Sequence, residues 1–259
     1  MSFTWGRPTF SIIMNIALLG HGNMGQEIER LARAKGIHAV SIALQNAGEK
    51  IDMGLVKSAD VVVDFTSPEI VLENIRAILS AGKNMVVGTT GWYDRLNEVE
   101  KLVKESGTGL IYGQNFSIGA NIFFQAVANA TKLTSAFGNY DVYGLEIHHA
   151  GKKDSPSGTA LRTAKEILDN STTKKVLQTG RLDRQINPEE LHFASVRGGK
   201  NPGFHEVVFD SNADAITISH SAHNREGFAE GALLAAEFIN GKKGVYTFDD
   251  VMNAKKPGH

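Results

Sequence analysis

Cysteine is absent from the 259-residue sequence, which removes three kinds of chemistry. Without a thiol the chain forms no disulfide, no thiolate metal site and uses no cysteine nucleophile. An excess of one charge is also lacking, since 27 basic residues balance 28 acidic ones to a formal net charge of -1. This balance gives no reason to expect a nucleic acid or an anionic membrane as partner. The lack of cysteine is compatible with a reducing compartment, and we expect a cytoplasmic protein.

Long apolar runs are lacking too, because no stretch approaches the roughly 20 apolar residues needed to span a membrane. Residues 11–19 are apolar and follow Arg7, as in a signal peptide. They pass directly into a glycine loop without a small-residue cleavage site, so we expect no export. With 42% hydrophobic residues, the chain can bury a sizeable core in one large domain or two modest ones.

Residues 146–160, EIHHAGKKDSPSGTA, concentrate acid-base groups, cations and a helix start. The β-branched and apolar residues of 142–147 predict a strand. Ser155 and Pro156 predict a helix opening, with serine as the cap and proline at the first helical position. The amides of Ser157, Gly158 and Thr159 would then be offered to an anion at the positive end of the helix.

His148 and His149 fall at the end of this strand, so they point to opposite faces and are expected to have different roles. An imidazole takes or gives a proton near neutral pH, and the ammonium group of Lys152 binds a carboxylate or donates a proton. The pattern suggests a small, multiply anionic substrate. The competing interpretation is a solvated turn with no function.

A second motif lies near the start of the chain, where an apolar run at 16–19 leads into a G-x-G-x-x-G loop and then a helix with a regular apolar face. In such loops the first glycine permits a tight turn, the second lets the backbone approach a pyrophosphate, and the third lets helix and strand pack closely. The predicted dinucleotide loop is Gly20, His21, Gly22, Asn23, Met24 and Gly25. Three glycines in an ordinary strand–helix turn are the alternative.

The residue that binds the adenosine ribose is expected about twenty positions beyond such glycines. Here Gln45 and Asn46 follow the predicted strand at 38–44, with no Asp, Glu or Arg in place. Gln45 can hydrogen-bond a ribose hydroxyl, but the choice between NADH and NADPH stays open.

Strand-like runs at 60–65, 84–88 and 109–112 alternate with helical stretches at 69–81 and 93–106. This alternation predicts a parallel α/β sheet, whose strands end at a common ligand-binding edge. The turns after these strands are therefore further cofactor-binding candidates: Phe65 and Thr66; Gly88, Thr89 and Thr90; and Gly113, Gln114, Asn115 and Phe116.

Beyond Ser117 the pattern changes to a long helix that reaches about Leu133. Strands near 193–197, 206–211 and 215–220 follow, and their pattern suggests antiparallel pairing. His205 and His220 are interpreted as core or interface histidines, and Arg197 receives no role. A final helix at 227–239 is apolar along one face and could return to the first domain.

Taken together, these motifs resemble the 4-hydroxy-tetrahydrodipicolinate reductase (dihydrodipicolinate reductase) family of lysine and diaminopimelate biosynthesis. The resemblance covers nearly the whole chain after Met14. Its carriers are GHGNMG at 20–25, DFTSPE at 64–69, GTTGW at 88–92, NFSIGAN at 115–121, HHAGKKDSPSGTA from 148 and SVRGG at 195–199.

The resemblance implies NAD(P)H-dependent reduction of the cyclic dicarboxylate 4-hydroxy-tetrahydrodipicolinate to tetrahydrodipicolinate, with loss of water. It implies a Rossmann-type dinucleotide-binding domain at 1–117, a substrate-binding and tetramerisation domain on an open mixed sheet at 118–224, and a returning segment at 225–259. Residues 1–13 are interpreted as an extension whose order the sequence leaves open.

The same resemblance assigns individual residues. His148 matches the acid-base residue, Lys152 the proton donor and His149 a substrate-binding histidine, while Gly158 and Thr159 match a backbone pair that holds a carboxylate. Lys153 is interpreted as a solvated charge and Asp154 as a residue that stabilises the loop. The chain departs from the family pattern in its shorter glycine loop and in Gln45, where the family has glutamate.

Three alternatives remain. One is a metal site built from His148, His149, Asp154 and another histidine, although no pair has the helical i, i+4 spacing and we assign no metal. Another is a module that senses NAD(P)H without catalysis, which would need no acid-base segment. The third is a reductase of the same scaffold acting on a different small dicarboxylate.

Overall fold

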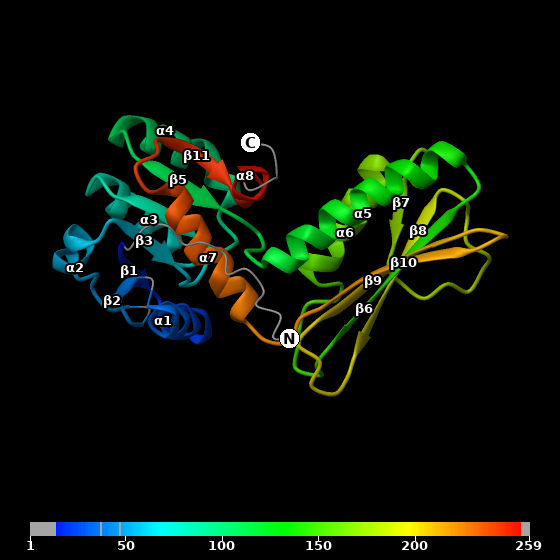
Figure 1. The fold of residues 1–259 in the computed structure, drawn as a ribbon, viewed down its shortest axis with the longest axis horizontal. Helices are drawn as coiled ribbons and strands as arrows, with labels where there is room; N and C mark the ends of the chain where they lie inside the picture. The colour runs from blue at the N-terminus through cyan, green and yellow to red at the C-terminus, as the bar shows by residue number, and fades with distance from the viewer. Residues whose placement is uncertain (1–13, 37, 47, 255–259) are drawn as a thin grey trace, which may run out of the picture. The chain divides into compact units, whose positions relative to one another are not determined.

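A computed structural model describes residues 14–36, 38–46 and 48–254, so the interpretation of residues 1–13 falls outside it. The chain divides into two compact units (Figure 1). The first combines the described parts of Met1–Ser117 and Arg225–His259, and the second is Ile118–Asn224. The first unit is therefore built from two separate stretches of chain.

The described residues of the first unit form a six-stranded sheet with the order β11-β5-β4-β3-β1-β2, in which all pairs are parallel. Its strands are apolar on both faces, as expected when helices cover both sides. The strand order reverses between β1 and β3, which is where ligands bind in such sheets. The strands are β1 Asn15–Leu19, β2 Ala39–Leu44, β3 Val61–Asp64, β4 Asn84–Val87, β5 Gly109–Tyr112 and β11 Gly244–Thr247.

Helices α1 and α7 cover one face of this sheet, and α2, α3 and α4 cover the other (Figure 1). Both faces are therefore buried, which makes this unit a doubly wound, Rossmann-type α/β domain. Its helices are α1 Asn23–Lys35, α2 Met53–Ser58, α3 Val71–Ser80, the 3-10 turn η1 Tyr93–Arg95, α4 Leu96–Ser106, α7 Glu226–Ile239 and α8 Phe248–Ala254.

The second unit carries a five-stranded mixed sheet with the order β10-β9-β6-β8-β7. Strand β9 is antiparallel to β6 and β10, whereas β8 is parallel to β6 and β7, so the antiparallel expectation holds for only part of the sheet. The elements are α5 Ile118–Phe137, β6 Asp141–His148, α6 Gly158–Asn170, β7 Val176–Gln178, β8 Glu190–Arg197, β9 Phe204–Asp210 and β10 Ala215–Ser221.

Strand β6 alternates between exposed and buried residues, so Val142, Gly144, Glu146 and His148 face the same side. Helices α5 and α6 lie on that side (Figure 1) and bury a core that includes Phe193. The opposite face of the sheet has no covering helix among the described residues, and Tyr143 of β6 and Val196 of β8 are exposed there, at 44% and 46%. The buried polar residues Glu146 and His148 thus lie on the side of the sheet that α5 and α6 cover, and the other side carries exposed side chains.

The expected α/β class, with a Rossmann-type domain and a second mixed sheet, is confirmed. The predicted start of α6 is wrong, because the helix begins at Gly158 with Ser157 as its N-cap. The Ser157 hydroxyl accepts a hydrogen bond from the amide of Ala160 at 3.1 Å. Four short elements were not anticipated, namely α2, β7, β11 and α8. No helix in the described ranges is both long and apolar enough to cross a membrane.

Candidate active site

The glycine loop follows β1 in the first unit, and each glycine has a distinct environment. Gly20 has φ 87°, and a Cβ built there would lie 2.5 Å from the carbonyl oxygen of Phe65. A Cβ at Gly25 would lie 2.1 Å from the carbonyl oxygen of Gly20. A Cβ at Gly22 would meet no described atom within 4 Å. Gly20 and Gly25 are therefore required by the fold, whereas Gly22 keeps open space in front of the loop.

The N-terminus of α1 suits a dinucleotide pyrophosphate. Gly22 is its N-cap, makes no side-chain cap bond, and no acidic residue lies in the first turn. Free amides at the positive end of a helix attract a phosphate. The loop is joined to the end of β2 by hydrogen bonds from the Gly20 amide to Leu44 O at 2.8 Å and from the His21 amide to Gln45 O at 3.1 Å. Gln45 is exposed beside the loop, and the imidazole of His21 pairs with Glu29 at 2.8 Å.

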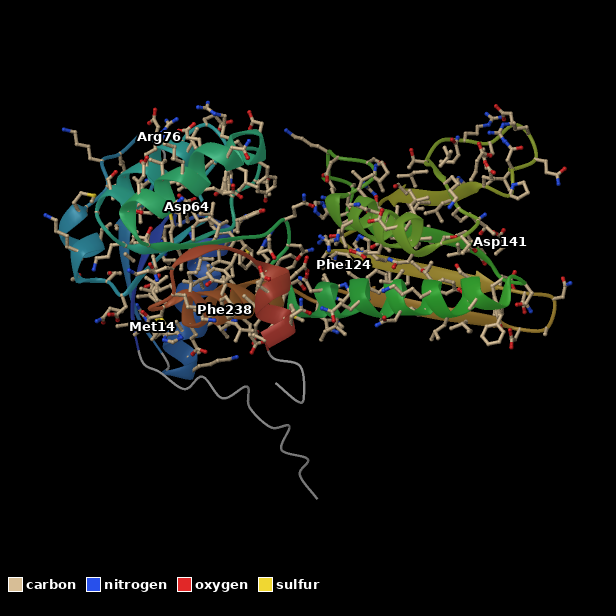
Figure 2. All side chains as sticks on the ribbon, turned by 90° about the horizontal axis from the view of Figure 1, so that it is seen from above. Met14, Asp64, Arg76, Phe124, Asp141 and Phe238 are labelled. Carbon is tan, nitrogen blue, oxygen red and sulfur yellow. The ribbon has the colours of Figure 1, made fainter. Side chains whose placement is uncertain are left out.

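Asp64, which is labelled in Figure 2, lies at the end of β3 and joins two predicted cofactor turns by hydrogen bonds. Its Oδ1 accepts hydrogen bonds from the Thr66 amide at 2.9 Å, the Thr66 hydroxyl at 2.7 Å and the Thr89 hydroxyl at 2.8 Å. Its Oδ2 accepts one from the Asn74 side chain at 2.8 Å. Burial raises the pKa of the Asp64 carboxyl despite these donors. The motif at 64–69 predicted the turn but gave Asp64 no role, because the hydrogen bond from Thr89 to Asp64 spans 25 residues of sequence.

The remaining cofactor candidates differ in exposure. A Cβ at Gly88 would lie 2.1 Å from the ring of Phe65, so these two turns interlock. The ring of Phe116 is buried against Phe65 and Phe248, with centroids 5.9 and 4.9 Å away, and its carbonyl oxygen would lie 1.8 Å from a Cβ at Gly231. The Asn115 side chain accepts a hydrogen bond from the Ser117 amide at 2.8 Å. Thr90 and Gln114 are exposed, and Gly113 is half-buried beside Phe116.

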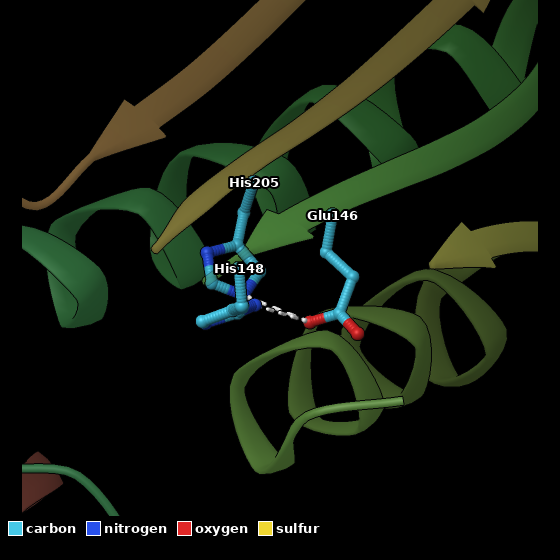
Figure 3. Close-up of side chains that lie close together, drawn as sticks. All are labelled: Glu146, His148 and His205. Carbon is cyan, nitrogen blue, oxygen red and sulfur yellow. Dashed lines mark ion pairs between the residues drawn. The ribbon is translucent and has the colours of Figure 1, made fainter. Parts of the chain in front are cut away.

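In the second unit, the carboxylate of Glu146 is fully buried and collects polar groups from three strands and α6. Its Oε1 accepts hydrogen bonds from the Ser157 amide at 2.9 Å, the Ser195 hydroxyl at 2.8 Å and the Arg197 guanidinium at 2.7 Å. Its Oε2 accepts one from the Ser157 hydroxyl. This oxygen also lies 3.2 Å from His148 Nδ1 and 3.5 Å from His205 Nε2 (Figure 3).

These contacts determine the charge states of Glu146 and His148. Burial alone would raise the pKa of Glu146, but the groups of His205, Ser157, Arg197 and Ser195 that face it hold the pKa well below its ordinary value. Burial lowers the pKa of His148 to about 4; the charges of His205, Lys152 and Arg197 act in the same direction and Glu146 opposes them. Glu146 is therefore ionised and His148 neutral at pH 7.

The residues after β6 are more exposed than His148, whose exposed fraction is 6%. His149 is exposed, and its amide donates to Asn201 O at 2.8 Å. The two histidines thus differ in environment. Lys152 Nζ pairs with Asp154 Oδ1 at 2.8 Å, and the Asp154 carbonyl accepts a hydrogen bond from Arg197 at 2.7 Å. Asp154 holds the loop in this way, as expected, while Lys153 is exposed.

The first turn of α6 differs from the expectation in one respect. The Ser157 amide is not offered to a ligand, because it donates to Glu146. Gly158 and Thr159 are the first two residues of the helix, and a Cβ at Gly158 would meet no described atom within 4 Å. The remaining candidates for binding an anion are therefore the amides of Gly158 and Thr159, at the start of the helix.

The metal alternative drew on His149 and Asp154, which the structure does not group with His148. Within the described ranges, the cluster with metal-ligand geometry is Glu146, His148 and His205, whose ligand atoms lie within 4.8 Å of one another. The Arg197 guanidinium on the same carboxylate opposes a second cation there. We assign no metal to this cluster.

The fold and these sites define a class: a two-unit, NAD(P)H-dependent oxidoreductase that acts on a small anionic substrate. The family model described as "Dihydrodipicolinate reductase, N-terminus" matches residues 14–116, and "Dihydrodipicolinate reductase, C-terminus" matches residues 119–252. The chain therefore belongs to the dihydrodipicolinate reductase family, as the resemblance predicted.

Relatives of known name agree with this family. The chain is 36% identical over 240 residues to a 4-hydroxy-tetrahydrodipicolinate reductase of Christiangramia forsetii, covering 93% of this chain and 98% of the relative. It is 36% identical over 236 residues to the enzyme of that name from Methanocaldococcus jannaschii, covering 90% and 84%. A solved dihydrodipicolinate reductase from Paenisporosarcina sp. TG-14 shares the fold, with a TM-score of 0.73, 23% identity, and coverage of 92% and 99%.

Proposed function

We propose that the chain catalyses the NAD(P)H-dependent reduction of 4-hydroxy-tetrahydrodipicolinate to tetrahydrodipicolinate, with loss of water, in lysine and diaminopimelate biosynthesis. The observation that carries this proposal is the segment from Glu146 to Thr159. It holds a buried imidazole, a lysine and a helix start within fourteen residues of chain. Family membership and the name of the relatives support the same reaction.

The first unit holds the dinucleotide. When bound, NAD(P)H supplies the hydride that reduces the substrate ring. The space in front of Gly22 and the uncapped start of α1 accept the pyrophosphate, and Gln45 is placed beside the loop to contact the adenosine ribose. Backbone and hydroxyl groups of the turns at 65–66, 88–90 and 113–116 contact the nicotinamide end.

The second unit binds and orients the dicarboxylate. The amides of Gly158 and Thr159 donate hydrogen bonds to one carboxylate at the positive end of α6, while His149 and Lys152 supply polar and cationic contacts. Fixing both carboxylates orients the ring before the reaction, and such positioning lowers a barrier by several kcal/mol or more.

Proton transfer is assigned to His148 and Lys152. Before the substrate arrives, His148 is a neutral imidazole without the extra proton that a general acid would transfer, because its pKa is about 4. A dianionic substrate raises the pKa of a nearby imidazole, so binding itself favours protonation of His148. Lys152, held by Asp154 in the absence of substrate, exchanges that partner for a substrate carboxylate and supplies the compensating proton.

The test is oxidation of NADPH and of NADH in parallel, with substrate generated in the cuvette by enzymatic condensation of pyruvate and aspartate semialdehyde. We expect rapid oxidation that requires the condensation product, and the two rates rank the cofactors. Binding of NAD(P)H without oxidation would overturn the proposal and favour a different dicarboxylate or a sensor.

The residue assignments have their own test. We expect His148→Ala and Lys152→Ala each to lower kcat far more than they weaken NADPH binding. Lys153→Ala is the matched control, because it removes the neighbouring exposed ammonium group and should keep both values. Unchanged turnover in either of the first two variants removes that residue from the mechanism.

A homotetramer in the cytoplasm completes the proposal. The uncovered face of the second sheet carries exposed Tyr143, Val176 and Val196, and paired copies would bury it. Sedimentation should give four chains per particle, and Tyr143→Asp should shift the particle toward smaller species. A monomer at micromolar concentration would contradict this assembly, and cell fractionation tests the location.

A further inference from the structure

Glu146 is the one buried carboxylate of the second unit that touches both functional parts of the proposed site. Its side chain has no exposed surface, and it precedes His148 by two residues on the same face of β6. It is therefore next to the acid-base candidate in the strand and next to the start of α6 in space.

We propose that Glu146 is the positioning residue of this reductase: its carboxylate orients the imidazole of His148 and fixes the first turn of α6, so that one buried group sets both the proton donor and the carboxylate-binding amides. This inference rests on the proposed function. It assigns Glu146 no contact with substrate or cofactor.

Glu146 binds the N-cap residue of α6, Ser157, through both the amide and the hydroxyl of that residue. Oε1 accepts the Ser157 amide and Oε2 accepts the Ser157 hydroxyl. Because the hydroxyl donates to Glu146, its lone pair is left to accept the Ala160 amide, and the cap is fixed in one orientation. The amides of Gly158 and Thr159, between Ser157 and Ala160, are held in place by the same contacts.

Glu146 also acts on the ring of His148. Its Oε2 lies 3.2 Å from Nδ1 in an ion-pair contact without hydrogen-bond geometry, so its negative charge favours a proton on Nδ1 and leaves Nε2 to exchange one. A Cβ at Gly203 would lie 3.0 Å from Nε2, so glycine at that position keeps the nitrogen from being covered. One nitrogen of the ring thus faces the carboxylate of Glu146, and the other faces the backbone of Gly203.

The charges around Glu146 indicate that its carboxylate affects proton transfer as well as the stability of the fold. Arg197 from β8, His205 from β9, and Lys152 from the loop all face the cluster, and Asp154 lies on Lys152. Every cation among them disfavours a protonated His148, whereas Glu146 is the group within contact distance that favours it. Removing the negative charge therefore acts on the proton chemistry as well as on packing.

Glu146→Gln tests the proposal, with Glu190→Gln as the matched control. Glu190 is a nearly buried glutamate of the same unit that also binds an arginine, Arg184, at 2.6 Å, but it does not contact the histidine cluster. For each variant we would measure kcat, KM for the substrate, NADPH affinity, the dependence of kcat on pH, and thermal unfolding.

For Glu146→Gln we expect kcat to fall about tenfold or more and the basic limb of the kcat profile to move to lower pH by about one unit, with unchanged NADPH affinity. Glu190→Gln should lose stability while keeping the wild-type kcat profile. A Glu146→Gln variant with wild-type kcat and pH profile, or with a loss explained by its unfolded fraction, overturns the proposal.

Glu146→Asp guards against a glutamine variant that does not fold. Aspartate keeps the charge for Arg197 but is one methylene shorter, so it cannot reach Ser157 and His148 together. We expect a lower kcat and a raised substrate KM, and wild-type values for both would overturn the proposal. If wild-type protein itself fails to oxidise NADPH with the substrate, the proposed function fails; if it is active and His148→Ala is not, the Glu146 variants decide this inference alone.

Discussion

Alanine at Gly25 and alanine at Gly22 should separate the two roles of glycine in the loop after β1. At Gly25 the new Cβ would lie 2.1 Å from the carbonyl oxygen of Gly20, which is backbone and cannot rotate away. Overpacking costs about 1–3 kcal/mol, and the helix preference of alanine recovers about 1 kcal/mol. Because the clash is with backbone, the cost lies at the upper end of that range, about 3 kcal/mol, and we expect Gly25→Ala to lower the free energy of unfolding by about 2 kcal/mol.

At Gly22 the same methyl group would meet no described atom within 4 Å, and the backbone φ of -74° suits any residue. The free energy of unfolding should therefore stay within about 0.5 kcal/mol of wild type. The methyl group would occupy the space where the backbone meets the pyrophosphate. We expect NADPH affinity to fall at least about tenfold, or about 1.4 kcal/mol.

Urea unfolding followed by circular dichroism and titration with NADPH followed by fluorescence measure the two quantities. Gly227→Ala is the control, since its Cβ would meet only the Ser117 hydroxyl among the described atoms, at 3.7 Å; it should keep NADPH affinity and gain up to about 1 kcal/mol of stability from the helix preference of alanine. Wild-type NADPH affinity in Gly22→Ala would refute the assignment of the pyrophosphate to this loop. Wild-type stability in Gly25→Ala would refute the close contact between helix and strand.

Three further outcomes are expected. Asp64→Asn should lower the free energy of unfolding by about 1–3 kcal/mol and weaken NADPH binding, because an amide group cannot accept hydrogen bonds from all four donors. Asp60→Asn, at an exposed aspartate, is the control, and an equal loss of stability there in urea unfolding would contradict this reasoning. Gly158→Ala should raise the substrate KM several-fold at unchanged stability, and an unchanged KM in steady-state kinetics would remove the helix start from the site. Arg184 lowers the pKa of Glu190 to about 2, below its ordinary 4.5, so its contribution to stability is present above pH 4.5 and lost as the pH falls toward 2. Glu190→Gln should flatten this part of a plot of urea midpoint against pH, and an unaltered slope would contradict the assignment.

The first unit could be predicted well from the sequence because its signals are local. A buried parallel strand appears as an apolar run, and the glycine spacing after β1 identifies the loop within six residues. Helix α2 was missed because its six residues carry too little periodicity to stand out. Strand β11 was missed because Gly244–Thr247, with the sequence GVYT, lacks the continuous apolar run that marks the equally short β3. Asp64 was missed for a different reason: its partner Thr89 lies in the turn after the neighbouring strand β4, and no local pattern records that hydrogen bond.

The second unit shows where local rules fail. Serine followed by proline is a good helix-opening signal, yet α6 starts after Pro156 at Ser157 and Gly158, because Glu146, eleven residues earlier, binds both polar groups of Ser157. The register of β6 with β8 and β9 brings Ser195, Arg197 and His205 to the same carboxylate. Such pairings follow from the sheet topology, which the sequence pattern alone described as antiparallel.

The split composition of the first unit has a consequence for how the protein is made. Its sheet gains its edge strand β11 and its covering helix α7 from the last part of the chain, after the whole second unit. During synthesis the second unit leaves the ribosome with all its strands, whereas the first has five strands and one face covered by α1 alone until α7 appears. The nucleotide-binding half, although begun first, is thus the last to be completed, and a nascent chain arrested before residue 225 would expose the apolar surface that α7 later covers.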